Sequence, residues 1–346
     1  MKAAVLRELG APLALVDGIA VPPLKPAQVL VRVAFTGVCH SQVMEARGRR
    51  GADNWLPHML GHEATGRVMR VGEDVSKVKP GDLVVLSWIK GTGADAGGCQ
   101  YLHGDELINA GGVTTFSDET IVSENRVTLL PEGVPLDVAV LFGCAMPTGA
   151  GLVLHELQPR PGTTIAVFGV GGIGMCALMA CAMHDFAKVI AVDVSDEKLA
   201  LAASLGAHVT VNARTADPVA AIRQETGGAG VDYSVDASGV ARVIEQAFEA
   251  THRTGITIFA SHPATGDKIA LDPHALISGK QIRGSWGGGS DIDRDIPAFA
   301  ALYRSGKLPL ERLVSRRYSL DRINDALDDL EQGRVVRPVV EINPDV

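Results

Sequence analysis

Thr163-Thr-Ile-Ala-Val-Phe-Gly-Val-Gly-Gly-Ile-Gly174 is an apolar, β-branched run that breaks into glycines and resumes as an apolar helical pattern. It predicts a strand, a tight turn and a helix. The turn contains four glycines, three of them in the pattern G-x-G-x-x-G: Gly169, Gly171, Gly172 and Gly174. Such glycines let the chain approach a pyrophosphate, which the free N–H groups of a helix N-terminus bind. Asp193 ends the next apolar run, where a carboxylate accepts hydrogen bonds from ribose hydroxyls. Together these features predict a dinucleotide site.

The segments after Thr148 alternate between strand-like and helix-like patterns. The predicted strands are Thr164–Phe168, Val189–Val192, His208–Val211, Asp232–Ser234, Thr257–Phe259 and Gln281–Ser285. The predicted helices are Gly149–Leu157, Gly172–His184, Glu197–Leu205, Pro218–Glu225 and Val240–Ala250. This alternation is typical of an α/β fold with a doubly wound parallel sheet.

Residues 1–143 contain short strand-like runs separated by glycine and proline. The predicted strands are Ala3–Leu6, Gln28–Phe35, Ala64–Val71 and Leu83–Trp88. Their spacing predicts an irregular antiparallel β domain rather than a parallel sheet. In the tail we expect helices around Ile296–Arg304 and Ser319–Gln332 and a strand at Val335–Ile342.

The composition is that of a well-packed soluble protein of more than one domain: 346 residues, of which 46% are hydrophobic and 21% charged. A net charge of −8 argues against a nucleic-acid or anionic-membrane partner, because neither attracts an acidic surface. The first residues, Met1–Glu8, show strand-like alternation and no signal peptide. Five scattered cysteines favour a reducing compartment, so we expect a cytoplasmic protein.

Three residues upstream of the glycine turn have metal-binding side chains: Cys39, His62 and Cys144. Two thiolates and one imidazole suit zinc, and three protein ligands leave a fourth position for water or substrate, as in catalytic sites. Their spacing does not establish that they converge. The alternative is that the two cysteines are small buried apolar residues and the histidine is a hydrogen-bonded loop residue.

Four segments occur in an order that is found in one known family: Gly37-Val-Cys-His-Ser41, Gly61-His-Glu-Ala-Thr-Gly66, Phe142-Gly-Cys-Ala-Met-Pro-Thr-Gly149 and the glycine turn. Over essentially its whole length the chain resembles the zinc-dependent alcohol dehydrogenases of the medium-chain dehydrogenase/reductase family, especially the branch with class III, formaldehyde-type enzymes. The resemblance implies a GroES-like catalytic domain over 1–145, an NAD-binding Rossmann domain over 146–286, and a return to the catalytic domain over 287–346. It also implies a homodimer or homotetramer, with the edge strand near 281–285 pairing between subunits.

The resemblance implies roles for individual residues. It places a catalytic zinc on Cys39, His62 and Cys144, with Glu63 near the metal as an occasional ligand or as a neighbour of the ligands. The residues expected at the coenzyme are His40 and Arg337 beside the pyrophosphate, Thr148 near the nicotinamide and Lys198 at the adenosine ribose. Asp193 implies NAD rather than NADP, because it would repel a 2′-phosphate. Ser41, beside a zinc ligand, is the hydroxyl we expect to take the substrate proton first.

The segment Gly91–Gly104 departs from the family pattern. Many relatives hold a second, structural zinc there with four cysteines, but only Cys99 remains in this chain. The other three positions hold Gly93, Ala96 and Leu107. One thiolate cannot hold a tetrahedral ion, so we predict one zinc per chain. A tight glycine-rich turn or a subunit contact would have to brace the loop instead.

Two residues near the first ligand also differ from many relatives. Gln42 stands where an aspartate usually binds the zinc-ligating histidine, and a neutral amide would make that histidine a less basic donor. Met44 stands where some members have a histidine that completes the proton relay.

Trp88 resembles an aromatic residue that lines the substrate pocket in relatives, and a role in the core is nearly as well supported. The remaining predictions are structural: core packing for Cys176 and Cys181, and a solvated helix start for the charged run Asp291–Asp295.

The predicted function is the reversible, NAD-dependent oxidation of an alcohol to an aldehyde or ketone. Zinc would act as a Lewis acid that lowers the pKa of a bound hydroxyl, and the nicotinamide would accept the hydride. Three alternatives stay open. The first is a polyol or sugar dehydrogenase, a branch that tends to use glutamate as the third zinc ligand, where this chain has Cys144. The second is a zinc-free quinone reductase or crystallin-like protein, but such proteins lack the Cys-His-Cys set. The third is a thiol-based redox protein, which would need a C-x-x-C pair. The sequence does not identify the alcohol.

Overall fold

The glycine-rich stretch 163–174 folds as predicted, with strand β11 (Thr164–Phe168), a turn, and helix α4 (Gly172–Cys181). The computed structural model describes residues 1–346 as two compact units. We call Ala145–Ser290 the continuous unit, and Met1–Cys144 with Asp291–Val346 the discontinuous unit. The predicted α/β class is confirmed.

The continuous unit is built on a six-stranded sheet in the order β13-β12-β11-β14-β15-β16, in which every neighbouring pair is parallel. The other strands are β12 (Lys188–Asp193), β13 (Val209–Asn212), β14 (Val231–Asp236), β15 (Thr251–Phe259) and β16 (Gln281–Gly284). Strand order reverses between β11 and β14, which is the doubly wound pattern that places ligand sites at the carboxyl ends of these strands. β16 is an edge strand that pairs only with β15. Pairing of this edge between subunits stays a prediction.

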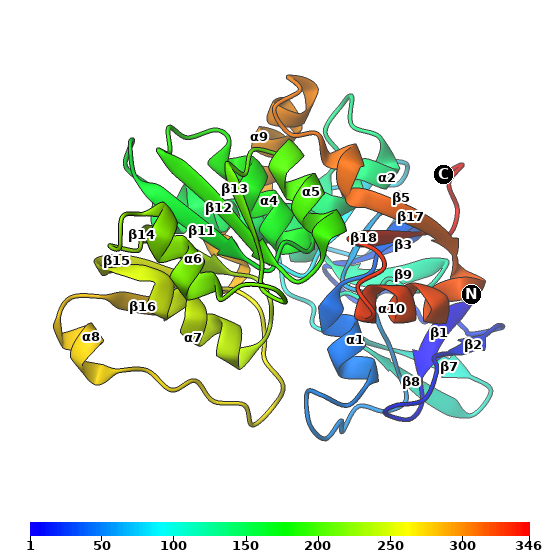
Figure 1. Cartoon of the computed structure of the whole chain (residues 1–346). Coiled ribbons are helices and arrows are strands. Elements are labelled where there is room, and N and C mark those ends of the chain that lie inside the picture. Colours follow the sequence, from blue (N-terminus) through cyan, green and yellow to red (C-terminus); the bar gives the residue numbers. More distant parts are fainter. The chain divides into compact units, whose positions relative to one another are not determined.

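Helices cover both faces of this sheet (Figure 1). The helices are α3 (Ala145–Gly151), α4, α5 (Asp196–Ser204), α6 (Pro218–Glu225), α7 (Ala241–Ala250) and α8 (Pro273–Ile277). Apolar side chains of α6 and α7, such as Ile222 and Ala247, pack with Phe168 and Ile190 of the strands into one buried cluster. Four of the five helices predicted here begin within one residue of the predicted start. The exception is Gly149–Leu157, which begins four residues earlier, because Pro147 is tolerated in a first helical turn, and continues as a π-helix over Leu152–Leu157.

The discontinuous unit contains two sheets, ordered β2-β1-β4-β8-β7 and β10-β6-β5-β3-β18-β17, with β9 also paired to β3. Their strands are β1 (Ala3–Leu6), β2 (Ala14–Val16), β3 (Gln28–Gly37), β4 (His58–Met59), β5 (Glu63–Val71), β6 (Leu83–Ser87), β7 (Cys99–His103), β8 (Glu106–Ala110), β9 (Glu119–Ser123), β10 (Val127–Leu129), β17 (Val314–Ser319) and β18 (Arg337–Glu341). Most pairs are antiparallel, as predicted, but β4 with β8 and β17 with β18 are parallel.

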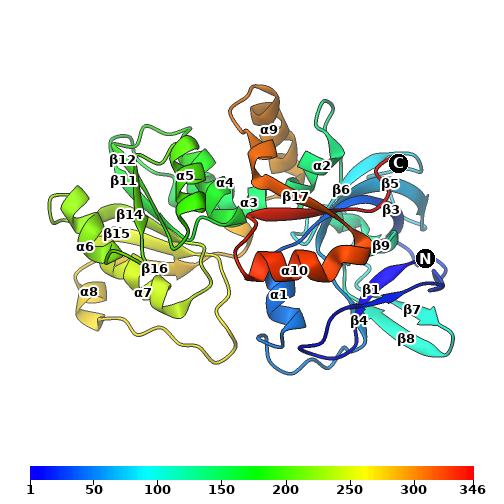
Figure 2. The same ribbon diagram turned by 45° about the vertical axis from the view of Figure 1, so that its right-hand side comes forward.

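Helix α1 (His40–Ala46) was not predicted, because its seven residues are too few to establish a helical period. It packs against α10 (Ile323–Glu331), as Figures 1 and 2 both show. Val43 and Ala46 of α1 share a buried cluster with Ile323 and Leu327 of α10. The remaining helices of this unit are α2 (Leu136–Ala139) and α9 (Ile292–Arg304). The C-terminal part of the chain therefore supports helix α1, whose N-cap is Cys39.

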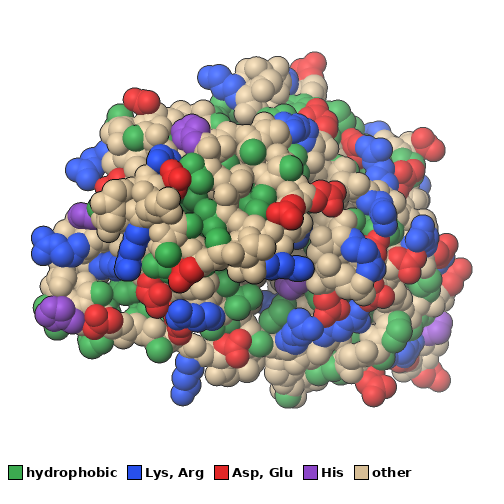
Figure 3. Space-filling model, in the orientation of Figure 1, with side chains coloured by type: hydrophobic (Ala, Val, Ile, Leu, Met, Phe, Trp, Pro, Cys, Tyr) green, Lys and Arg blue, Asp and Glu red, His purple; other side chains and the backbone are tan.

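No helix has both the length and the apolar composition needed to cross a bilayer by itself. One bent pair, Leu136–Gly143 with Ala145–Leu157, meets the two criteria only when its members are taken together. Acidic and basic side chains are interspersed on the face of the molecule in Figure 3.

Candidate functional site

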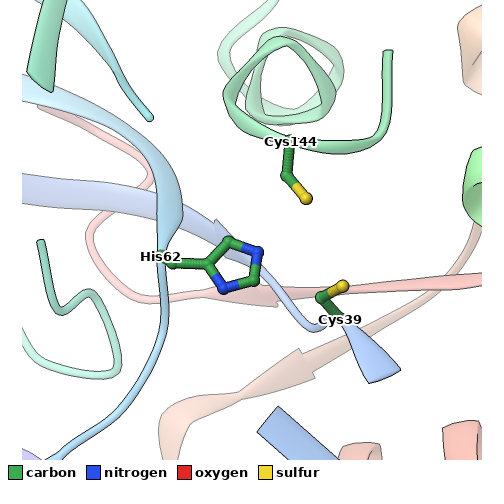
Figure 4. A group of neighbouring side chains, drawn as sticks. All are labelled: Cys39, His62 and Cys144. Carbon is green, nitrogen blue, oxygen red and sulfur yellow. The ribbon is translucent and has the colours of Figure 1, made fainter. Parts of the chain in front are cut away.

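Cys39, His62 and Cys144 converge in the discontinuous unit, although 23 and 82 positions separate them in the sequence. Their ligand atoms all lie within 4.8 Å of one another, and Figure 4 shows the three side chains turned toward a common point. Cys39 is the N-cap of α1, His62 precedes β5, and Cys144 follows the 3-10 turn Val140–Gly143. Both cysteines are buried and free of disulfides.

The two nitrogens of His62 have different surroundings. Nε2 is buried and has no hydrogen-bond partner. Nδ1 lies against the side-chain amide of Gln42 and 3.5 Å from Oγ of Ser41. A buried nitrogen without a partner loses its hydration without compensation. A metal ion bound at Nε2 would satisfy it, so the donor set fits a zinc ion.

The pKa values of the two cysteines are shifted in opposite directions. A hydrogen bond from Cys144 holds the pKa of Cys39 well below its usual value, and the positive charge of Arg337 adds to the effect. The same hydrogen bond and burial raise the pKa of Cys144 well above its usual value. A divalent cation would stabilise both sulfurs as thiolates.

Glu63 and Arg337 form a buried ion pair beside this cluster. Glu63 is fully buried, and Oε2 of its carboxylate has no hydrogen-bond partner. Burial raises the pKa of Glu63, although Arg337 opposes the change. Burial alone would lower the pKa of Arg337, but the charges of Glu63 and of the cysteine sulfurs raise it well above its usual value. The sequence resemblance did not predict this pair; ligation by Glu63 and a pyrophosphate contact by Arg337 stay predictions.

The glycine turn has the geometry that its motif predicts. Gly169 has a φ of +78°, and a Cβ there would lie 2.7 Å from the backbone nitrogen of Ser238. A Cβ on Gly174 would lie 2.0 Å from the carbonyl oxygen of Gly169, so only glycine allows helix α4 to pack this closely on the turn. A Cβ on Gly171, the N-cap of α4, would point into open space. That open space lies where a pyrophosphate would meet the helix N-terminus.

Asp193 ends β12 with its carboxylate directed at the glycine turn. Its Oδ2 accepts a hydrogen bond from the Val170 N–H (2.9 Å), and its Oδ1 accepts from the N–H groups of Val194 (2.8 Å) and Ser195 (3.0 Å). The carboxylate thus joins the ends of β11 and β12 in the absence of any ligand. Oδ1 thus uses both of its lone pairs, whereas Oδ2 keeps one that could accept a ribose hydroxyl.

The other residues expected at a coenzyme lie in both units. Thr148 on α3 is buried and its Oγ1 has no hydrogen-bond partner, and Lys198 lies in the first turn of α5. His40 is exposed at the start of α1. Their roles toward a coenzyme stay predictions.

The segment that lacks the structural-zinc cysteines is held by two carboxylates. Glu124 accepts hydrogen bonds from the N–H groups of Ser76 (2.6 Å), Lys77 (2.9 Å) and Ala94 (3.1 Å). Asp293 accepts from both the N–H and the hydroxyl of Thr92, each at 2.7 Å. Asp293 also binds Nζ of Lys77 (2.8 Å) and the hydroxyl of Thr128 (3.0 Å). We call Glu124 and Asp293 the carboxylate brace.

The contacts of Asp293 show that the prediction of a solvated helix start over 291–295 was partly wrong. Asp291 caps α9 as predicted, since it accepts hydrogen bonds from the N–H groups of Asp293 and Arg294. Only part of the run is solvated: Asp291 and Arg294 are exposed. Asp293 binds three other residues of the unit, and Asp295 is only 3% exposed. The sequence did not reveal this, because nothing in the pattern links position 293 to position 92.

The remaining predicted side chains take the following places. Cys99, Cys176 and Cys181 are buried, and Cys99 packs with Tyr101 and Ile108. Trp88 lies edge-on to His62, with the ring centroids 6.5 Å apart. Met44 is buried on α1 and has no group that could carry a proton.

The chain matches two family models. Residues 25–132 match the alcohol dehydrogenase GroES-like domain, and residues 172–303 match the zinc-binding dehydrogenase model. Both predicted domain types are thereby confirmed.

Solved structures resemble the chain along nearly its full length. An alcohol dehydrogenase zinc-binding domain protein from Burkholderia ambifaria is 32% identical, with a TM-score of 0.86 over 98% of each chain. The benzyl alcohol dehydrogenase of Acinetobacter calcoaceticus is 28% identical, with a TM-score of 0.87 over 99% of each chain. An alcohol dehydrogenase from Thermus sp. ATN1 is 25% identical, with a TM-score of 0.82 over 99% of this chain and 100% of that one.

Proposed function

Because the chain belongs to the zinc-binding alcohol dehydrogenase family of medium-chain dehydrogenases, we propose that it oxidises an alcohol reversibly to an aldehyde or ketone, with NAD as the hydride acceptor and one zinc ion on Cys39, His62 and Cys144. The observation that carries the proposal is the convergence of two buried sulfurs and an unpartnered imidazole nitrogen. When bound, zinc supplies Lewis acidity and the nicotinamide supplies the site for hydride.

Cys39, Cys144 and His62 would hold the ion with a charge of −2 from the thiolates, which leaves the site neutral overall with a divalent cation. The buried positive charge of Arg337 favours the thiolate form of both sulfurs, and Glu63 forms an ion pair with its guanidinium. The lowered pKa of Cys39 favours its thiolate, which is the form that binds a metal ion.

Ser41 would receive the proton that an alcohol releases. Its hydroxyl lies beside the His62 ring and is half-buried, so it can both accept a proton from a substrate hydroxyl and donate one outward. Met44 cannot continue this path, so the proton would have to leave through water or through His40, which is exposed one residue before Ser41.

NAD would lie at the carboxyl ends of β11 and β12. The open side of Gly171 and the N-terminus of α4 would receive the pyrophosphate, and Asp193 would bind the adenosine ribose. The negative charge of Asp193 supports NAD over NADP, because a 2′-phosphate beside it would be repelled.

The test is a substrate panel read by NADH formation, together with zinc content. We expect turnover with at least one class among primary, secondary and polyol alcohols; benzyl alcohol belongs in the panel because a 28% identical relative is named for it. Cys144→Ala should lose zinc and turnover, whereas Cys176→Ala, a matched change at a buried cysteine outside the cluster, should keep both. Alcohol oxidation by zinc-free protein would refute the proposal.

A further inference from the structure

A second group of ligand-type side chains lies in the discontinuous unit, apart from the cysteine cluster. Glu45 on α1, Asp53 in the following loop and His58 in β4 have ligand atoms within 4.8 Å of one another. Nε2 of His58 lies 2.8 Å from Oδ2 of Asp53 and 4.0 Å from Oε1 of Glu45. The alcohol chemistry proposed above uses none of these residues.

His58 presents Nε2 to the two carboxylates and Nδ1 to a backbone carbonyl. Its side chain is only 8% exposed, and Nδ1 lies 3.0 Å from the carbonyl oxygen of Met59. A carbonyl only accepts hydrogen bonds, so Nδ1 carries the proton. Nε2 then faces Oδ2 of Asp53 at hydrogen-bond distance, 2.8 Å, and Oε1 of Glu45 at 4.0 Å. A cation at Nε2, either a proton or a metal ion, joins the three groups.

The carboxylates are also held in orientation by groups outside the trio. Oε2 of Glu45 accepts from Nη1 of Arg50 (3.3 Å), and Oδ1 of Asp53 accepts from the Trp55 N–H (2.9 Å). Each acid therefore uses one oxygen for its outer contact and turns the other toward Nε2. Outer contacts of this kind, together with a backbone carbonyl on the far nitrogen of a histidine, are what orient ligands at metal sites.

We propose that Glu45, Asp53 and His58 form a second metal site, which binds a divalent transition-metal cation such as Mn²⁺ or Zn²⁺. One imidazole and two carboxylates suit these ions. Ligands at about 2.0–2.2 Å from an ion lie about 3–3.5 Å from one another, and the two measured separations from Nε2 bracket that range. The site would join α1, whose N-cap is the proposed zinc ligand Cys39, to the loop that carries the exposed Trp55.

This site does not depend on the proposed alcohol chemistry, and it differs from the structural zinc that the cysteine losses exclude. Occupation by zinc would raise the content above the single ion predicted from the cysteines. Mn²⁺ is the more selective probe, since thiolates prefer softer ions and the cysteine cluster, once filled with zinc, would not take it up.

The experiment titrates zinc-replete full-length protein with Mn²⁺ and follows free Mn²⁺ by its electron paramagnetic resonance signal. We expect the chain to bind a single Mn²⁺, with at least tenfold weaker binding in Glu45→Gln and none in His58→Gln. His103→Gln is the matched control, because His103 is exposed beside one carboxylate, Glu106 at 3.9 Å, and has no second. It should bind Mn²⁺ like the unmodified chain.

Two outcomes overturn the proposal. The first is that the unmodified chain takes up neither Mn²⁺ nor a second zinc, which would mean that a proton on Nε2 is the cation that joins His58 to the acids. The second is that binding is equal in the unmodified chain and in Glu45→Gln. Glu45 lies on helix α1 with its side chain 29% exposed, so Glu45→Gln should fold normally. Its Mn²⁺ binding can therefore be compared with that of the unmodified chain even if His58→Gln does not fold.

Discussion

The side-chain amide of Gln42 lies against Nδ1 of His62, on the opposite side of the ring from the nitrogen that has no partner. The same side chain accepts a hydrogen bond from the Cys39 N–H through its oxygen, at 2.9 Å. One residue thus orients two of the three zinc ligands that we propose. The relationship also places an uncharged group where many relatives have an aspartate.

Gln42→Ala should weaken zinc binding about 10–100-fold, because outer contacts of ligating histidines have that effect on metal affinity. Gln42→Glu should tighten it, since a carboxylate makes the imidazole a stronger donor. Chelator competition measures both, and Met44→Leu on the same helix is a volume-conserving control that should change little. Equal zinc affinity in Gln42→Ala and the unmodified chain would contradict this role.

Asp193→Asn should raise the preference for NADP relative to NAD about tenfold or more. Two like charges about 4 Å apart repel by about 1–4 kcal/mol at effective dielectric constants of 80–20, and the amide removes that repulsion while keeping an acceptor for the Val170 N–H. The ratio of kcat/KM values for the two coenzymes measures the change. Asp196→Asn, in the first turn of α5, is the control. A ratio unchanged in Asp193→Asn would show that the carboxylate does not contact the ribose.

Asp293→Asn should open the segment 90–98 without loss of zinc. The amide removes a charged acceptor that Thr92, Lys77 and Thr128 share, and a hydrogen bond to a charged group contributes about 1.5–3 kcal/mol. Hydrogen exchange of the segment's amides measures the opening. Zinc removal from the unmodified chain should leave these amides protected; loss of protection on chelation would mean that metal, not the brace, holds the loop.

The brace should also weaken in acid. Burial would raise the pKa of Asp293, but Lys77 and Thr92 outweigh it and hold the pKa below its usual value. The native state therefore binds this proton less readily than the unfolded chain does. Its contribution to stability is present above the unfolded-state pKa and is lost as the pH falls through the lower native value. Amide protection of 90–98 should decline in that window.

Asp236 should show the opposite dependence. Burial raises its pKa to about 6, and its Oδ2 has no partner. Because the native state holds this proton more tightly than the unfolded chain, stability is highest below about pH 4 and falls as the pH rises to about 6, by about 3 kcal/mol at 1.36 kcal/mol per pKa unit. Urea unfolding should show Asp236→Asn gaining stability over the unmodified chain with rising pH. Asp267→Asn, at an exposed carboxylate, should track the unmodified chain.

The sequence predicted those features that depend on short stretches or on a motif. The bounds of β11 and α6 agree with the prediction to the residue, because β-branched runs and a proline at N1 fix them locally. The glycine roles follow from backbone geometry alone, so Gly169 and Gly174 could be assigned in advance. The convergence of Cys39, His62 and Cys144 came from family resemblance, since no local pattern joins such distant positions.

Long-range polar contacts could not be predicted. Arg337 and Glu63 are 274 residues apart, and neither flanking sequence carries a signal for the other. The same holds for Asp293 and Thr92, 201 residues apart. Strand β15 was predicted six residues too short at its start, because its first half, from Thr251, is polar and lacks the apolar pattern of a buried strand.

The carboxylate brace has a consequence for redox damage. A loop fastened by four thiolates around zinc comes apart when an oxidant converts the thiolates to disulfides or sulfenic acids. Glu124 and Asp293 have no such chemistry, and the one cysteine of the segment, Cys99, is packed in the core. In this protein peroxide would therefore oxidise the proposed zinc ligands Cys39 and Cys144 while the segment 90–98 stays folded. Inactivation that stops at a disulfide or sulfenic acid should be reversible by a thiol reductant and fresh zinc.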